Sequence, residues 1–84
     1  MSKTIYWSKA PNGTTHVNAG TIHEPLKNIG KDGVPLNSVY WEYHAGDVVC
    51  FYDKIYDKFI PLETKMVCML NSVFWIKNPN HLDS

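Results

Sequence analysis

Apolar and polar residues alternate in three short segments of the chain, and each segment contains one of the three tryptophans. These segments are 4–9, 36–44 and 70–77. Successive side chains of an extended chain point to opposite faces, so such alternation is typical of a β-strand with one buried face. The pattern therefore predicts three strands that each carry a tryptophan.

The three segments also resemble one another in sequence. Trp7, Trp41 and Trp75 have the same spacing of 34 residues in both intervals (41 − 7 and 75 − 41). The stretch ending at Trp41 reads LNSVYW, the one ending at Trp75 reads LNSVFW, and the one ending at Trp7 reads TIYW. A helical repeat of this period is disfavoured, because β-branched and aromatic residues favour strands. We interpret the similarity as an internal duplication followed by a closing strand; the alternative is chance similarity in a chain rich in Tyr, Asn and Lys.

The phase of the alternation separates two kinds of side chain. Val39, Trp41 and Tyr43 share one face of the predicted strand, whereas Tyr40 and Glu42 share the other with polar neighbours. We therefore expect the tryptophans to lie in the core with aliphatic residues, and the aromatic residue before each tryptophan to lie on an accessible face.

A β-hairpin is predicted around Ala45-Gly46, since a glycine-containing pair lies between two apolar runs. A two-residue turn at this pair places His44 opposite Asp47 as an ion pair at the hairpin end. The other opposite pairs are Glu42 with Val49, Trp41 with Cys50, and Tyr40 with Phe51. The core face of this hairpin is then formed by Trp41, Tyr43, Val48, Cys50 and Tyr52.

Turn residues and periodicity predict the remaining elements. An earlier hairpin is expected between 4–9 and 14–19, and a long connection over 20–35. The tandem repeat YDKIYDKF at 52–59 would stack like charges on a helix, so strand, turn and strand is favoured there. Apolar residues at helical spacing after Pro61 predict a short helix or 3-10 segment near 61–70. Residues 78–84 form a polar tail that is expected to fray.

Together these elements predict a mainly β protein. We expect one domain over 1–84, built as a small antiparallel sheet or a partly open five-stranded barrel with the short helical segment near 61–70. Its length of 84 residues leaves no room for a second core.

Composition narrows the classes of function. Eight lysines balance eight acidic residues, and arginine is absent, so the bidentate side chain that reads guanine and phosphate is missing. Nucleic acid is therefore disfavoured as a partner. The chain shows neither a signal peptide nor a spanning apolar run, so we expect no membrane association and a cytoplasmic location. Cys50 and Cys68 lie in apolar stretches and are expected to be buried, inert thiols.

The sequence contains no recognisable catalytic motif. There is no nucleophile elbow and no glycine-rich phosphate loop, and the four histidines lack the spacing of metal ligands. We therefore favour a non-enzymatic protein and assign no catalytic residues, metal or cofactor. The third hypothesis is a small hydrolase or a metal enzyme, for which His16, His23 and Glu24 are the conceivable ligands of a divalent ion.

The candidate binding surface is the aromatic and polar face of the predicted sheet, because aromatic residues among polar ones are enriched in protein interfaces. Its members are Tyr6, Tyr40, Glu42, His44, Phe51 and Phe74. We expect this face to dock a protein partner or a second copy of the chain. Short, neutral domains of this kind are typical of bacteriophage accessory and inhibitor proteins.

The alternative is a module that binds a carbohydrate or a single-stranded nucleic acid by aromatic stacking. This alternative requires a concave aromatic face bordered by Lys9, Lys54, Lys58 and Lys77.

Overall fold

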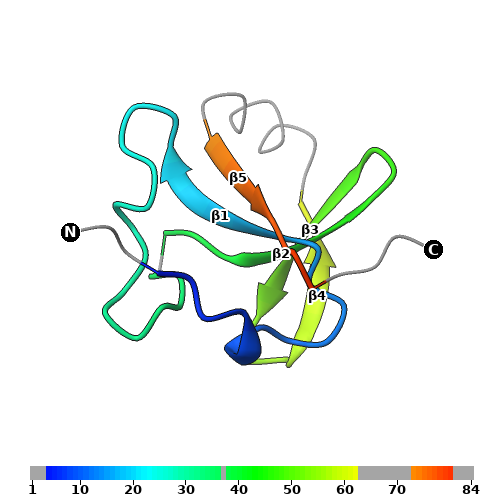
Figure 1. Cartoon of the computed structure of the whole chain (residues 1–84). Helices are drawn as coiled ribbons and strands as arrows, with labels where there is room; N and C mark the ends of the chain where they lie inside the picture. Colours follow the sequence, from blue (N-terminus) through cyan, green and yellow to red (C-terminus); the bar gives the residue numbers. More distant parts are fainter. Residues whose placement is uncertain (1–3, 37, 63–72, 81–84) are drawn as a thin grey trace.

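Five antiparallel strands form one open sheet in the order β4-β3-β2-β1-β5 (Figure 1). The structure is a computed structural model that describes residues 4–36, 38–62 and 73–80. Its elements are η1 (Trp7–Lys9), β1 (His16–Thr21), β2 (Trp41–Ala45), β3 (Val48–Asp53), β4 (Lys58–Pro61) and β5 (Val73–Lys77). The prediction of a mainly β protein with an antiparallel sheet is confirmed.

Helix is limited to the three-residue 3-10 turn η1 within the described residues. Most of the helix predicted near 61–70 lies outside them, but Pro61 is the last residue of β4 and does not begin a helix. No helix in the described part of the chain is long and apolar enough to cross a membrane.

Residues 4–9 do not form the predicted strand, and their predicted hairpin with 14–19 is wrong. Within this segment Trp7–Lys9 form η1, and the Tyr6 amide before it donates to the Gly33 carbonyl at 3.1 Å. The reason is that β1 is already paired with β2 on one edge and with β5 on the other. No edge of β1 remains for a further strand, so residues 4–9 pack over the face of the sheet.

The β2–β3 hairpin forms, but its predicted register is wrong by two residues. Ala45 pairs with Val48 and Glu42 with Phe51, so that Gly46 and Asp47 make the turn. Gly46 has φ +61°, a left-handed conformation that two-residue hairpin turns require and glycine adopts readily. A shift of two keeps every side chain on its predicted face but changes the opposite partners.

The new register also removes the predicted ion pair of His44 with Asp47. His44 is opposite Val49, and its imidazole lies against the Glu42 carboxylate.

One face of the sheet carries the core. Val17, Ile29 and Trp41 are buried there, and residues of the N-terminal segment and the 22–39 connection pack against them. The ring centroids of Trp7 and Trp41 are 5.7 Å apart. The core role predicted for the tryptophans therefore holds for Trp41 and its neighbour Trp7.

Trp75 lies on the opposite face, contrary to the prediction. Val17 is opposite both Trp41 and Ile76, whereas Trp75 is opposite Asn18. Because neighbouring residues of a strand point to opposite faces, Trp75 and Trp41 are on different sides of the sheet. The three similar segments therefore do not occupy equivalent places in the structure.

The predicted core face of the β2–β3 hairpin is covered only in part. Cys50 and Trp41 are buried as expected, whereas Tyr43 and Val48 are 38% and 49% exposed. Both lie near the free end of the hairpin, which extends past the segments that pack over the core (Figure 1). Cys68 lies outside the described residues.

The remaining connections follow the predictions more closely. The repeat at 52–59 forms the end of β3, a turn and the start of β4, as expected. The long connection folds over the sheet, with bridges between Gly20 and Pro25 and between Ile29 and Pro35.

Candidate ligand-binding cleft

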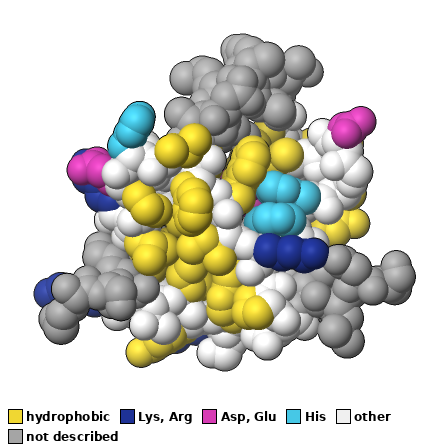
Figure 2. Space-filling model, turned by 45° about the horizontal axis from the view of Figure 1, so that its top comes forward, with side chains coloured by type: hydrophobic (Ala, Val, Ile, Leu, Met, Phe, Trp, Pro, Cys, Tyr) yellow, Lys and Arg dark blue, Asp and Glu magenta, His cyan; other side chains and the backbone are white. Residues whose placement is uncertain are grey.

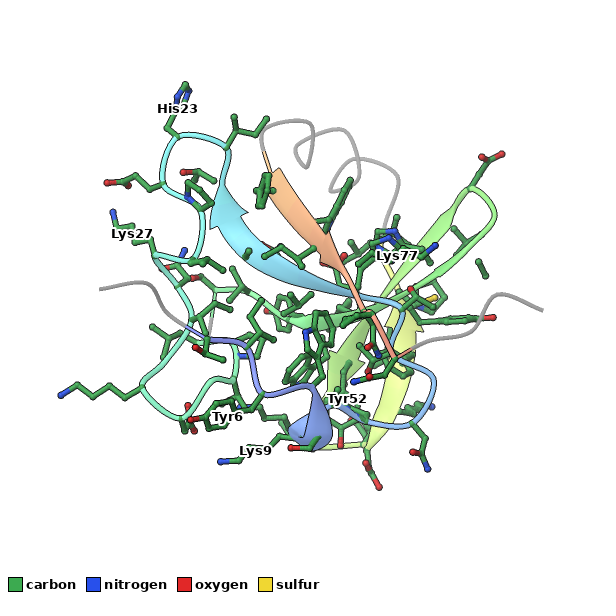
Figure 3. All side chains as sticks on the ribbon, viewed as in Figure 1. Tyr6, Lys9, His23, Lys27, Tyr52 and Lys77 are labelled. Carbon is green, nitrogen blue, oxygen red and sulfur yellow. The ribbon has the colours of Figure 1, made fainter. Side chains whose placement is uncertain are left out.

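An open cleft of about 610 Å³ lies where η1, the 34–41 segment and the β3–β4 hairpin meet. Figure 3 shows Lys9 and Tyr52 at this end of the molecule. A volume of this size is typical of small-ligand sites, which combine aromatic walls with a few polar groups. The cleft is lined by four aromatic residues (Tyr40, Trp41, Tyr52, Phe59), three lysines (Lys9, Lys54, Lys58), Asn12, Asp57 and the apolar Pro11, Val34, Pro35 and Val39.

The lysines give the cleft a positive rim. Lys9, Lys54 and Lys58 are exposed, and none forms an ion pair with a carboxylate of the described residues. The ammonium groups of Lys9 and Lys58 lie 5.8 Å from the ring centroids of Tyr6 and Tyr56, within the range of a cation–π contact. The cleft is therefore suited to an anionic ligand.

The aromatic side chains of the cleft contact aromatic neighbours on adjacent strands. The rings of Tyr52 and Phe59 are paired across β3 and β4, with centroids 5.7 Å apart, and Phe59 also contacts Tyr43 at 5.9 Å. Tyr52 and Phe59 remain partly exposed, whereas Trp41 is buried and Tyr52 packs against the core cluster to which it belongs. The cleft thus offers flat apolar surface on side chains that are fixed by their neighbours.

The turn of the β3–β4 hairpin is held by its two aspartates. Oδ1 of Asp53 accepts hydrogen bonds from the amides of Ile55 and Tyr56 at 2.8 and 3.2 Å, and Asp57 has φ +54°. The Tyr52 hydroxyl donates a hydrogen bond to Oδ1 of Asp57. These bonds fix the positions of Lys54 and Lys58 on either side of the turn.

The hydrogen bond to Asp57 is also the main cause of a raised pKa at Tyr52; burial and the charges of Asp57 and Asp53 act in the same direction. The native state therefore keeps the phenol proton at a pH where the unfolded chain has lost it. The stability that this bond contributes is fully present below pH 10.0, the ordinary pKa of tyrosine, and is lost as the pH rises above it.

We expect the free energy of unfolding to fall above about pH 10, and to fall less steeply in Tyr52→Phe. Urea unfolding at several pH values from neutral to alkaline would measure both proteins, with Tyr43→Phe as a control for loss of another tyrosine hydroxyl. Identical pH profiles for the wild type and Tyr52→Phe would contradict the expectation.

The opposite face of the sheet holds a cluster of polar side chains around Glu42. The Glu42 carboxylate is 1% exposed; its Oε1 lies 2.9 Å from Nε2 of His44, and Nδ2 of Asn18 donates to its Oε2 at 3.5 Å. The imidazoles of His16 and His44 stack with centroids 3.9 Å apart, and the edge of Trp75 meets His44 at 5.0 Å. Figure 2 shows the two stacked imidazoles beside a lysine and a band of apolar side chains.

This cluster joins β1, β2 and β5. Oγ1 of Thr15 accepts a hydrogen bond from the His44 amide at 2.8 Å and lies at the same distance from Nδ1 of His16. Nε1 of Trp75 is buried and has no hydrogen-bond partner within the described residues. Because the Glu42 carboxylate is buried and bonded to His44 and Asn18, we assign the cluster a role in stabilising the sheet.

The six residues expected to form one binding face occupy separate places. Glu42 is buried and His44 lies beside it, so the Glu42 carboxylate cannot contact a partner. Tyr40 and Phe51 do contact each other, with ring centroids 4.9 Å apart, as a diagonal pair across the strands.

Tyr6 and Phe74 are both exposed, but neither belongs with the other four residues. Tyr6 lies beside Gly33 on the covered side of the sheet, and Phe74 alternates with Trp75 onto the face opposite Glu42. The single surface expected from the alternation is therefore not formed.

The four lysines of the alternative hypothesis are also divided. Lys9, Lys54 and Lys58 border the cleft, whereas Lys77 is opposite His16 on the other face. Phe59 is not among the residues predicted from the sequence to bind a ligand, and Tyr52 is predicted only as a core residue. The tandem repeat at 52–59 held a usable signal, because a hairpin within it places its first and last aromatic residues opposite each other.

No group of three potential metal ligands occurs among the described residues. Comparison of the chain with protein-family models, with curated proteins and with solved structures finds no match. The assignment of a function therefore depends on the geometry of the cleft.

Proposed function

We propose that this protein is a binding domain whose cleft holds a single-stranded nucleic acid. One observation carries the proposal: three lysines without an ion-pair partner in the described residues border one cleft walled by aromatic rings. Proteins that bind single strands combine a positive groove along the backbone with aromatic side chains on which bases stack.

The proposed ligand differs from the expectation based on net charge. The whole chain is neutral, but the residues that line the cleft include three lysines and one aspartate. Within the Debye length of about 8 Å at physiological salt, a phosphate experiences these near charges more strongly than distant ones. The local excess of positive charge supports contact with a few phosphates.

The absence of arginine argues for binding that tolerates different base sequences. Arginine supplies the bidentate contact to guanine edges, whereas lysine acts as a point charge on phosphate. Stacking on Tyr52 and Phe59 is available to any base, because every base has a flat face. We therefore expect similar affinities for oligomers of different composition.

Titration of a fluorescently labelled oligothymidylate, followed by anisotropy, tests the proposal. If three lysines each neutralise one phosphate, the logarithm of the binding constant should fall with the logarithm of salt concentration with a slope of about −2. Lys58→Gln should weaken binding and reduce the magnitude of the slope by about 0.7. Lys31→Gln is the matched control, because Lys31 is also exposed but lies outside the cleft.

Two outcomes would contradict the proposal. One is that the oligonucleotide does not bind at low salt, and the other is that Lys58→Gln and Lys31→Gln change its affinity equally. A neutral oligosaccharide and an acidic one are included as competitors. Tighter binding of either sugar than of the oligonucleotide would assign the cleft to carbohydrate instead.

A second candidate function is docking of a protein partner, for which the contact between Tyr40 and Phe51 is the supporting observation. These two residues border a separate apolar groove beside the β3–β4 hairpin.

A further inference from the structure

The groove beside the β3–β4 hairpin adjoins the cleft. It has a volume of about 290 Å³, and Leu36, Phe51 and Ile55 line it without belonging to the cleft. Four further residues line both the groove and the cleft: Val39, Tyr40, Tyr52 and Lys54. Tyr52, which Figure 3 labels, is therefore part of the boundary between the two. A ligand that fills the cleft reaches the entrance of the groove.

The wall of the groove is aromatic and apolar. The rings of Tyr40 and Phe51 have their centroids 4.9 Å apart and are tilted by 51°. Tyr40 is exposed and Phe51 partly exposed, so neither ring is closed off from a ligand. Leu36 and Ile55 add exposed apolar surface beside them. The groove thus offers a fixed aromatic surface of the kind on which a base stacks.

The charges of the groove differ from those of the cleft. Lys54 lines both, whereas Lys9 and Lys58 line only the cleft. The groove also contains Asp53, whose Oδ1 accepts hydrogen bonds from two amides of the hairpin turn. One lysine and one aspartate leave the groove without net charge. A phosphate is therefore favoured over the cleft and at Lys54, and an uncharged base is favoured in the groove.

The shared wall favours one occupant for both hollows. Half of the residues that line the groove also line the cleft, so a protein docked in the groove would cover part of the cleft wall. A strand already held in the cleft meets no such conflict, because its next nucleotide enters the groove past Lys54. Single-strand binding domains commonly contact about 4–16 nucleotides, which is more than one base needs.

We propose that the groove is a second base-binding subsite for the same strand, with a base packed against Phe51 and Tyr40 and the phosphate before it at Lys54. The inference rests on the proposed function of the cleft. It extends that function from a short piece of single strand to a strand that continues across the end of β3.

Anisotropy titrations with two oligothymidylates, of about three and about eight nucleotides, test the subsite at low salt. The shorter strand is chosen to occupy only the cleft, and the longer one to reach the groove. Phe51→Ala should weaken binding of the longer strand at least about fivefold, the effect of losing one stacked base, and leave binding of the shorter strand unchanged. The longer strand also gains affinity by offering more registers, but this gain is the same in the wild type and the variant.

Two further variants control this comparison. Phe51→Leu keeps most of the apolar volume beside Tyr40 but offers no flat ring, so it should also weaken binding of the longer strand alone. Phe74→Ala is the matched control, because Phe74 is an exposed phenylalanine outside both the cleft and the groove. Unchanged affinity for the shorter strand shows that each variant is folded.

The two proposals fail in different ways. If the wild type binds neither strand, the proposed function is wrong and the second subsite is wrong with it. If the wild type binds the shorter strand, two results would overturn the subsite alone. One is that both Phe51 variants bind the longer strand as the wild type does, which would leave the groove to a protein partner. The other is that they weaken binding of both strands equally.

Discussion

Replacement of Trp41 by alanine should lower the free energy of unfolding by about 3–5 kcal/mol, the usual cost of removing a large buried aromatic side chain. Trp41 is 5% exposed and contacts Trp7, while Val17 lies opposite it on β1. The loss combines the burial of the indole with the cavity that remains, because the neighbouring strands cannot fully collapse into it. A domain of this size has a total stability of about 4–13 kcal/mol, so the substitution should remove a large share of it.

Tyr43→Ala provides the matched control for this prediction. Tyr43 lies two residues further along β2 on the same face, but it is 38% exposed. Its replacement should cost about 1 kcal/mol, because the side chain is already partly exposed and loses a cross-strand contact with the Phe59 ring. Urea unfolding followed by circular dichroism measures both variants. Equal losses would show that Trp41 is not in the core.

Gly33→Ala should also destabilise the protein strongly. Gly33 has φ +79°, a conformation that costs about 1–2 kcal/mol for a residue with a Cβ atom. That Cβ would lie 2.7 Å from Cγ of Tyr6 and 2.9 Å from its backbone nitrogen, and 3.0 Å from the Thr4 carbonyl oxygen. Two of the three close contacts are to backbone atoms, which no change of rotamer can relieve. We therefore expect a loss of more than about 3 kcal/mol, as the N-terminal segment is forced away from the sheet.

Gly46→Ala separates the effect of backbone conformation from the effect of crowding. Gly46 has φ +61°, but an added Cβ would meet no atom within 4 Å. This variant should therefore lose only about 1–2 kcal/mol. Thermal and urea unfolding of both variants measures the difference, and losses of the same size would indicate that Tyr6 and Thr4 do not crowd Gly33.

The candidate site could be predicted only in part from the sequence. Lys54 and Lys58 are recognisable as neighbours because one short hairpin joins them. Lys9 reaches the same cleft from a segment more than 40 residues away, through the packing of η1 over the sheet. The alternation of apolar and polar residues correctly placed Glu42, His44 and Phe51 on one face of the sheet. It could not show that the Glu42 side chain is buried on that face. Whether a face is covered depends on segments distant in the sequence.

The sequence by itself determined the β class, the hairpins around Gly46 and within 52–59, and the two faces of β2 and β3. These features depend on interactions between residues near one another in the chain, namely the alternation of side chains and the conformational freedom of glycine in a tight turn. The face assignment was also insensitive to the error in register, because a shift of two residues leaves every side chain on the same side.

Only the tertiary structure decided which face Trp75 occupies and where residues 4–9 lie. Trp75 is on the face opposite Trp41 because of the register of β5 on β1. Residues 4–9 form no strand because β2 and β5 already occupy both edges of β1. The three similar segments pack against different parts of the chain, so their similar local sequences adopt different structures. The physical reason is that strand pairing and burial arise between distant parts of the chain, where local sequence similarity imposes no constraint.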